Sequence, residues 1–255
     1  MKKSDYVKGK YGNPILINAD DFGLDHNTNL AIIELLKSNR IQRTTLLVNM
    51  PATLEAYEMA KENNLLNHVG LHINMTDGVP LTQDIHRTRF VQNGVFAVRQ
   101  VEIGTRLHIT KKEAEAAKLE IQAQFDRFKE LFGYYPQHVD SHRHFHNYFG
   151  FLFIIKDIAR KCGVKSMRIG INLYDHTEAS FAKKTYKFML NTFIRHYFKS
   201  TDYIGAWLEY INYYTDGTNK SVEIMVHPTY KDGNIYDIIY GENDEKRFYD
   251  FAKIR

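Results

Sequence analysis

The sequence predicts an α/β protein built on a parallel sheet, and the number of its repeats favours an incomplete, TIM-barrel-like (β/α) barrel. Short apolar runs typical of buried strands alternate with amphipathic helical patterns, as crossovers between parallel strands require. Polar residues with useful chemistry follow directly after several of these runs. In a barrel the C-terminal ends of the strands meet at one mouth, so we expect these residues to share a site there.

The N-terminal half of the chain alternates strands with helices. Strands are predicted at residues 14–19, 43–49 and 68–74, and helices at 25–39 and 51–64. Asp25 can cap the first helix, in which Leu30, Ile33 and Leu36 recur at helical spacing. This half therefore provides consecutive strand–helix units of the expected barrel.

The C-terminal half continues the pattern and adds two insertions. Strands are predicted at residues 137–141, 165–169 and 221–226, and a helix at about 148–162. Residues 110–113 form a capping box that starts a further helix, and Gly133 ends it. We expect a single catalytic domain over residues 1–255, with insertions at about 75–109 and 170–200.

The composition indicates a cytoplasmic protein without a nucleic-acid or membrane partner. The chain has 34 basic and 30 acidic residues, and this small excess, spread along the sequence, does not suggest a nucleic-acid binder. Cys162 is the one cysteine, which excludes an internal disulfide and fits a reducing compartment. No apolar run follows the N-terminal lysines, and none approaches the roughly 18 residues of a membrane span.

Two adjacent carboxylates, Asp20 and Asp21, follow the first strand in the segment NADDFG (18–23). At a strand end both must be solvated, paired or bound to a cation. One carboxylate on a metal ion and one holding a proton would satisfy both. The alternative is a helix cap or a turn, where Asp and Gly are also common.

The strand GLHIN (70–74) carries a histidine among apolar residues. Asn74 follows His72 at the same parity, so both side chains would face the same side of the sheet. A hydrogen-bonded core histidine is the alternative interpretation of His72.

The segment HVDSHRHFH (138–146) places four histidines and Asp140 at one parity. A strand of that length is unusual, so the later histidines are expected in the following loop and His138 in a structural role. In a helix, His142 and His146 would lie one turn apart, at a known ligand spacing. The metalloprotease pattern would then require Glu after the first histidine, where Arg143 stands.

His227 follows the apolar strand of residues 221–226 and precedes Pro228, which blocks continuation of the strand ladder. Its imidazole is a candidate general acid, and a capping or core-edge histidine is the alternative. Two histidines and one carboxylate on a divalent metal leave positions open, which is typical of catalytic sites. With a spare carboxylate as base and a histidine as acid, these parts predict hydrolysis of an amide or ester.

The chain resembles the YdjC-like carbohydrate deacetylases, which include chitooligosaccharide deacetylases. NADDFG, GLHIN followed by Pro80-Leu81, HVDSHRHFH and EIMVHP occur in the same order, so the resemblance spans about residues 14–233. It implies a deformed (β/α) barrel and metal-dependent removal of acetyl groups from a small acetylated sugar. Thr229 stands where the family commonly has Gly or Ala. The chain also ends earlier than is usual for the family, so we expect one barrel stave to be missing or supplied differently.

Transferred residue by residue, the resemblance implies one divalent ion, Mg²⁺ or Zn²⁺, held by Asp21, His72 and His142. It implies Asp20 as general base and His227 as the acid that protonates the leaving amine. The remaining polar residues are expected to contact the sugar or to support the ligands: Asn74, Asp140, His144, His146 and Arg168. In particular, the resemblance implies that Arg168 orients Asp20 or the substrate. His146 is the alternative ligand if the site uses the one-turn spacing from His142.

Two other functions could use the same residues. A metal-dependent phosphoesterase would need a second metal and a cationic clamp, for which Arg143 and Arg168 are candidates. A non-catalytic sugar-binding or metal-sensing module would keep the pocket without turnover, and Thr229 and the short C-terminus favour it.

The segment KKTYKFMLNTFIRHYFK (183–199) mixes basic and aromatic residues at roughly helical spacing. We interpret it as an insertion helix that packs on the barrel or on a second copy in a homodimer. A membrane-surface helix is the alternative, and it would require a cleaner apolar face.

Overall fold

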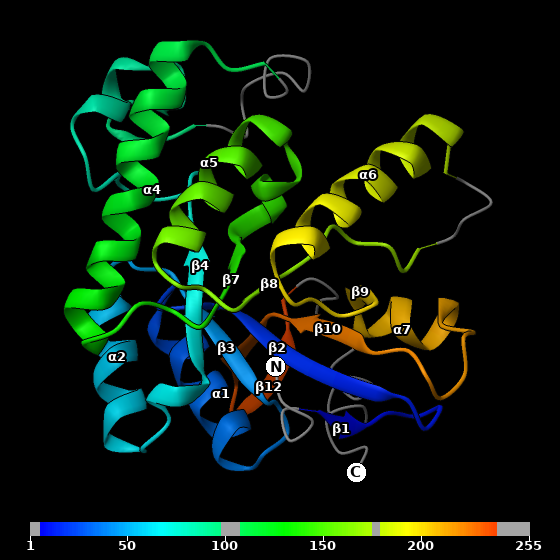
Figure 1. The fold of residues 1–255 in the computed structure, drawn as a ribbon. Coiled ribbons are helices and arrows are strands. Elements are labelled where there is room, and N and C mark those ends of the chain that lie inside the picture. The colour runs from blue at the N-terminus through cyan, green and yellow to red at the C-terminus, as the bar shows by residue number, and fades with distance from the viewer. Residues whose placement is uncertain (1–5, 98–107, 175–178, 239–255) are drawn as a thin grey trace.

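A curled parallel sheet lies at the centre of the computed structural model, which describes residues 6–97, 108–174 and 179–238 (Figure 1). Along the sheet the strands are β8 (Ser166–Met167), β7 (His138–Ser141), β4 (Val69–Ile73), β3 (Arg43–Leu46), β2 (Pro14–Phe22), β10 (Val222–Val226) and β9 (Tyr203–Ala206). Neighbours on this path are parallel, and the short β1 (Val7–Lys8) pairs antiparallel with β2. The sheet forms a half-barrel, which confirms the predicted deformed (β/α) barrel.

Helices connect the successive parallel strands. In chain order they are α1 (His26–Lys37), α2 (Thr53–Glu62), α4 (Lys111–Phe132), α5 (Phe149–Lys161), α6 (Phe181–Tyr197) and α7 (Trp207–Tyr213). Figure 1 shows α4 and α5 next to each other on one side of the barrel and α6 on the other. None of the described helices is long and apolar enough to cross a membrane.

The helix ends follow the local signals in the sequence. The Asp25 side chain accepts a hydrogen bond from Thr28 N at the start of α1. Thr110 and Glu113 form the predicted capping box of α4, and Gly133 ends that helix with a left-handed φ of 78°. Leu30, however, is 36% exposed, because α1 buries the neighbouring Ile32 and Leu35 together with Ile33 and Leu36.

The two edges of the half-barrel are joined by irregular hydrogen bonds. Met167 N of β8 donates to Lys199 O at 3.1 Å, and Leu173 N donates to Ile204 O of β9 at 3.0 Å. The sequence did not predict β9 or α7, because apolar and aromatic residues run together there without a clear period. The segment FYDFAKIR (248–255), on which the expectation of a missing or differently supplied stave rests, lies outside the described residues.

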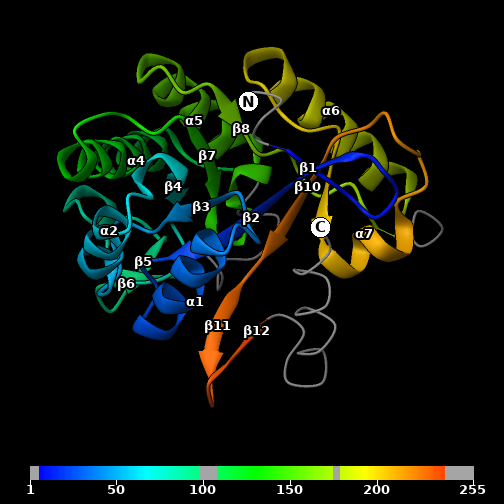
Figure 2. The same cartoon turned by 90° about the horizontal axis from the view of Figure 1, so that it is seen from below.

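Both predicted insertions contain short elements of their own. The first holds the 3₁₀ helix Asp84–Arg87 and a hairpin of β5 (Val91–Gln92) and β6 (Val95–Phe96), while residues 98–107 lie outside the described residues. The second holds α6. A hairpin that was not predicted, β11 (Pro228–Lys231) and β12 (Asn234–Asp237), projects from the body beside α1 (Figure 2).

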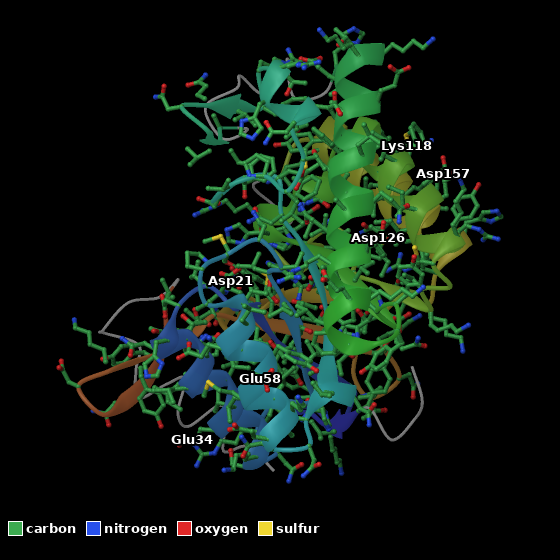
Figure 3. All side chains as sticks on the ribbon, turned by 90° about the vertical axis from the view of Figure 1, so that its left-hand side faces the viewer. Asp21, Glu34, Glu58, Lys118, Asp126 and Asp157 are labelled. Atoms are coloured by element: carbon green, nitrogen blue, oxygen red, sulfur yellow. The ribbon has the colours of Figure 1, made fainter. Side chains whose placement is uncertain are left out.

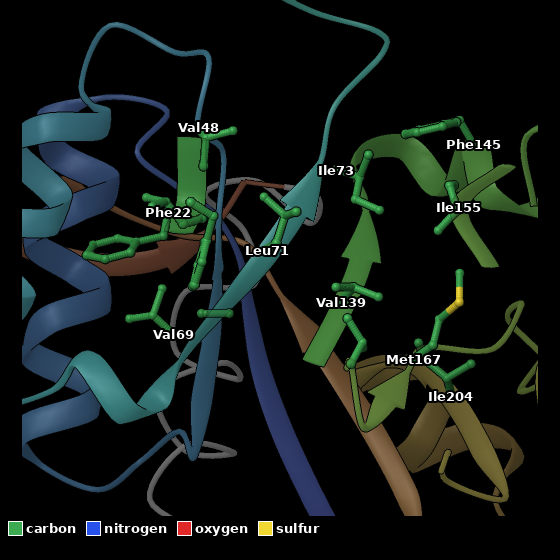
Figure 4. Close-up of a cluster of buried hydrophobic side chains, with 14 of the residues drawn as sticks. Phe22, Val48, Val69, Leu71, Ile73, Val139, Phe145, Ile155, Met167 and Ile204 are labelled. Carbon is green, nitrogen blue, oxygen red and sulfur yellow. The ribbon is translucent and has the colours of Figure 1, made fainter. Parts of the chain in front are cut away.

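The two faces of the sheet differ in chemistry. Leu71 and Ile73 of β4 and Val139 of β7 belong to one apolar cluster on the face that the helices cover (Figure 4). His72, between Leu71 and Ile73, and Asp140, next to Val139, face the concave interior and contact each other. Branched apolar side chains usually fill a barrel interior, so the polar interior distinguishes this barrel and locates its site.

Candidate active site

Asp20 and Asp21 reach the same site because the backbone of β2 changes conformation at its end. Asp21 has a left-handed φ of 67°, and the register of β2 with β3 shifts between Ala19 and Phe22. Consecutive strand side chains normally point to opposite faces, and a bulge re-aims one of them. Figure 3 shows Asp21 at the ends of the strands, apart from the labelled charged side chains on the helices.

Asp21, His72 and His142 form a compact group of buried donor atoms. Asp21 Oδ1 lies 2.7 Å from His142 Nδ1 and 3.2 Å from His72 Nε2. One donor atom from each of the three residues falls within 4.8 Å of the others. The structure therefore brings together the three residues that the resemblance implies as metal ligands.

This group fits a divalent cation. Asp21 Oδ1 is buried and has no contact of hydrogen-bond geometry among the described residues, although two imidazole nitrogens face it. Imidazole nitrogens and a carboxylate oxygen are common ligands of Zn²⁺ and similar ions. His72 Nδ1 lies 2.5 Å from Asp140 Oδ1, which leaves Nε2 directed at the group, as in the carboxylate–histidine pairs of metal sites.

The electrostatics of the group favour positive charge. Burial opposes protonation of His72, but the charge and hydrogen bond of Asp140 raise its pKa to about 10. The pKa of His142 is also raised in spite of burial, because its ring contacts Asp21 and Asp77. Burial alone would raise the pKa of Asp21, yet contacts with the two imidazoles hold it well below its usual value. The carboxylates around the two imidazoles therefore favour positive charge at this position, which suits a cation.

Arg168 fixes Asp20 from inside the barrel. Its Nη1 and Nη2 atoms donate to Asp20 Oδ2 and Oδ1 at 2.5 and 2.6 Å, and its side chain is fully buried. Arg168 also contacts Asp140 at 2.8 Å and Glu223 at 2.6 Å. Burial would lower the pKa of Arg168, but the three carboxylates raise it well above its ordinary value. Although burial opposes ionisation of Asp20, Arg168 keeps the pKa of that carboxyl lowered.

His227 lies on the other side of Asp20. Its Nε2 atom is 3.7 Å from Asp20 Oδ2, and its side chain is 15% exposed. Its backbone N–H donates to Asp237 Oδ2 at 3.0 Å, so the β11–β12 hairpin fixes the position of the residue. The predicted acid and base thus face each other at the end of the sheet.

The histidines after β7 occupy different environments. Residues 142–147 form a 3₁₀ turn in which Arg143 and His144 have left-handed φ values of 52° and 53°, so the α-helical interpretation was wrong. His146 Nδ1 lies 2.5 Å from Ser141 Oγ, and burial together with the charge of Arg168 lowers its pKa to about 4. His138 Nε2 lies 3.2 Å from the carbonyl oxygen of Thr44. His138 and His146 thus bond to other protein groups.

Four residues expected near the sugar are almost completely buried: Asn74, Asp140, His146 and Arg168. Asn74 accepts from Thr76 N and Asp77 N at 3.0 and 3.1 Å and so builds a turn after β4. Asp140 contacts His72, and Arg168 contacts Asp20, within the buried interior. These contacts favour support of the site over contact with the substrate.

Sequence reasoning missed three residues of the site. Asp77 Oδ2 lies 3.0 Å from His142 Nε2, and Thr45 Oγ1 lies 3.1 Å from Asp140 Oδ2. Glu223 Oε2 accepts from Arg43 Nη2 at 2.7 Å and joins it to Arg168. A charged residue within an apolar strand was the available signal for Glu223, whereas Asp77 resembles an ordinary turn residue.

The fold and site define the class of this protein: a deformed (β/α) barrel with an Asp/His cluster at its strand ends. Comparison with known proteins identifies its family. The model of the family described as YdjC-like protein matches residues 14–252. The chain belongs to this YdjC-like family, which confirms the resemblance of the motifs.

Relatives and a solved structure agree with this assignment. The chain is 31% identical over 226 residues to the carbohydrate deacetylase of Halalkalibacterium halodurans, covering 86% of each chain. It is 35% identical over 147 residues to the chitooligosaccharide deacetylase of Proteus mirabilis, covering 58% of this chain and 55% of that one. The crystal structure of an Enterococcus faecalis protein, provisionally assigned to cellobiose-phosphate cleavage, has a TM-score of 0.63 at 24% identity and covers 86% and 82% of the two chains. That last similarity concerns the fold.

Proposed function

We propose that this protein is a metal-dependent hydrolase that removes acetyl groups from N-acetylated sugars of the chitooligosaccharide or N-acetylglucosamine type. Its YdjC-like family and its relatives named carbohydrate and chitooligosaccharide deacetylases support the substrate class. One geometric observation carries the reaction type. Two imidazole nitrogens face Asp21 Oδ1, while a spare carboxylate and a further histidine stand beside this group.

In this proposal Asp21, His72 and His142 hold one divalent ion, Mg²⁺ or Zn²⁺. When bound, such an ion acidifies water and stabilises negative charge on the acyl oxygen. Three protein ligands leave a coordination position open, as catalytic sites require. Asp140 holds His72 with Nε2 directed inward, and this hydrogen bond makes the ligand geometry independent of the substrate.

Asp20 is the proposed general base. Its pKa is lowered although burial opposes ionisation, because Arg168 stabilises the carboxylate, so Asp20 is ionised and has an oxygen lone pair for a proton of the attacking water. The two hydrogen bonds from Arg168 also fix the direction of its oxygen atoms. The water oxygen then bonds to the acetyl carbon as the proton passes to Asp20.

His227 is the proposed acid. Its Nε2 atom lies close to Asp20 and its side chain is partly exposed, so it can reach the sugar nitrogen from the open side. It donates a proton to that nitrogen as the C–N bond breaks, and acetate and a free amine are released. His144, whose side chain is partly exposed, is a proposed contact for the sugar, although its Nδ1 atom is buried and has no hydrogen-bond partner among the described residues.

The arginines that would favour a phosphoesterase are already paired. Arg168 is buried among three carboxylates, and Arg143 Nε donates to Asp77 Oδ2 at 2.8 Å. Neither presents an unpaired guanidinium for a phosphate, so these two residues do not favour phosphate-ester hydrolysis.

The test is acetate release from diacetylchitobiose by chelator-treated protein before and after Mg²⁺ or Zn²⁺ is added back. We expect release that depends on the metal. Phosphate release from a sugar phosphate without acetate release would favour the phosphoesterase. Tight binding of the sugar with neither product would favour a binding module.

A further inference from the structure

Asp77 connects the turn after β4 to the two residues that follow β7. Its Oδ2 atom lies 3.0 Å from His142 Nε2 and accepts hydrogen bonds from Arg143 Nε at 2.8 Å and Thr76 Oγ1 at 2.9 Å. The side chain is 31% exposed, so it lies at the rim of the site. One carboxylate oxygen therefore contacts both His142, a candidate metal ligand, and its neighbour Arg143.

The two candidate ligand imidazoles are arranged in opposite senses around Asp21. His72 directs Nε2 toward Asp21 and Nδ1 toward Asp140. His142 directs Nδ1 toward Asp21 and Nε2 toward Asp77. Each ring thus lies between the shared inner carboxylate and a second, outer carboxylate.

We propose that Asp77 is a positioning residue that makes His142 a metal ligand through Nδ1, as Asp140 makes His72 a ligand through Nε2. This inference rests on the proposed metal site. A neutral imidazole carries a proton on one nitrogen, and the acceptor on that side decides which nitrogen is free for a metal. Asp77 accepts the proton on Nε2, so Nδ1 keeps its lone pair toward Asp21.

Hydrogen bonds within the protein hold the turn that carries Asp77. Asn74 Oδ1 accepts from Asp77 N, and Asn74 Nδ2 donates to Asp77 O at 2.8 Å. Helix α4 holds this turn, because the buried Gln124 accepts from Asn74 N and donates to Asn74 O at 2.8 and 2.6 Å. None of these four bonds uses the side chain of Asp77, so we expect truncation of that side chain to preserve them.

Metal affinity, measured by competition with a chelator, tests the proposal without a substrate. Loss of an outer carboxylate typically lowers metal affinity by about 10–100-fold, and we expect this for Asp77→Ala. Asp77→Asn should recover part of the loss, because its amide oxygen still accepts an N–H. Asp84→Ala, at a 57% exposed site that contacts Arg87, and Arg143→Gln should each change affinity by less than about threefold, since neither touches His142 Nε2.

Long-range ¹H–¹⁵N spectra of the zinc-loaded protein, labelled in histidine and assigned with His142→Ala, identify the ligand nitrogen. We expect Nδ1 for His142 and Nε2 for His72. The proposal would be overturned if His142 bound the metal through Nε2 or if Asp77→Ala left the metal affinity unchanged. It would also be overturned if Arg143→Gln lowered the metal affinity as much as Asp77→Ala, or if the wild-type protein bound no metal. A wild-type protein that binds metal but releases no acetate would contradict the proposed function. The metal affinities of the variants would still test the positioning role of Asp77.

Discussion

The two faces of β4 carry different kinds of side chain: one face is apolar and packs in the core, and the other is polar and belongs to the site. Leu71 and Ile73 pack under the helices with no exposed surface, and they contribute the apolar burial that stabilises the fold. His72, between them, turns into the barrel interior, where Asp140 and Arg168 complete a network of buried charges. In this barrel the outer face provides stability and the inner face provides the site, so substitutions on the two faces should separate these properties.

The largest expected effect is on the inner face, at Arg168. Arg168→Met would leave the buried carboxylates of Asp20, Asp140 and Glu223 without their shared cation. Removing one partner of a buried ion pair typically costs about 3–5 kcal/mol, and we expect that loss in the free energy of unfolding measured with urea. Arg127→Met, which removes a surface pair with Glu130, should change it by less than about 0.5 kcal/mol. Equal effects would contradict the proposed role of the interior network.

The neighbouring pair Leu71 and His72 gives the sharpest contrast between the faces. Leu71→Ala should lower the free energy of unfolding by about 2–5 kcal/mol, because it opens a cavity in the apolar core, while the folded protein still binds metal. His72→Ala should abolish specific metal binding. Metal titration of both folded proteins checks this contrast, and loss of metal from Leu71→Ala would show that the two faces are not independent.

Metal itself should stabilise the fold through the inner face. A ligand that binds only the folded state adds about 2.7 kcal/mol at a concentration one hundred times its Kd. We expect such a gain for the wild type in urea unfolding with Zn²⁺ or Mg²⁺, and none for Asp21→Asn, which lacks the shared carboxylate. An equal metal-induced gain in the free energy of unfolding of Asp21→Asn would show that the ion binds at another position.

Gly70 offers a smaller test of packing inside the barrel. A Cβ at this position would collide with the ring and the carbonyl oxygen of His138 on β7. Gly70→Ala should therefore lower the free energy of unfolding by about 1–3 kcal/mol, the usual effect of overpacking. His138→Ala in the same chain should recover part of this loss, since it removes the ring. If His138→Ala recovers none of the lost unfolding free energy in this double-mutant cycle, the destabilisation by Gly70→Ala comes from the backbone alone.

The elements on the apolar face could be predicted because their signals are local. Apolar runs identified β2, β4 and β10, and capping residues identified the ends of α1 and α4. The position of Leu30 at the edge of α1 was not predicted, because Ile32 and Leu35 extend the buried face beyond a simple repeat.

The interior could be predicted only in part, because its geometry depends on contacts between distant segments. The strand-end rule predicted that the segments carrying Asp21, His72 and His142 would meet, and the structure brings these three residues together. The choice of these three as metal ligands came from the family resemblance. The left-handed backbone at Asp21, Arg143 and His144 could not be located from residue type. Only a few per cent of non-glycine residues adopt this conformation, and although Asp and His do so more often than most, their presence does not identify the position. Asp77 was missed because its partner, His142, lies far away in the sequence and meets it only in the folded chain.

The most direct test of the account compares Asp20→Asn with the wild type in two assays on the same preparation, metal content and acetate release from diacetylchitobiose. Asp20 lies beside the proposed ligands and contacts Arg168 and His227, so it should act on the proton and not on the ion. The account predicts metal content near that of the wild type and a loss of turnover of at least about a hundredfold, the usual lower range for a general base. Loss of the metal, or full activity with the metal in place, would contradict it.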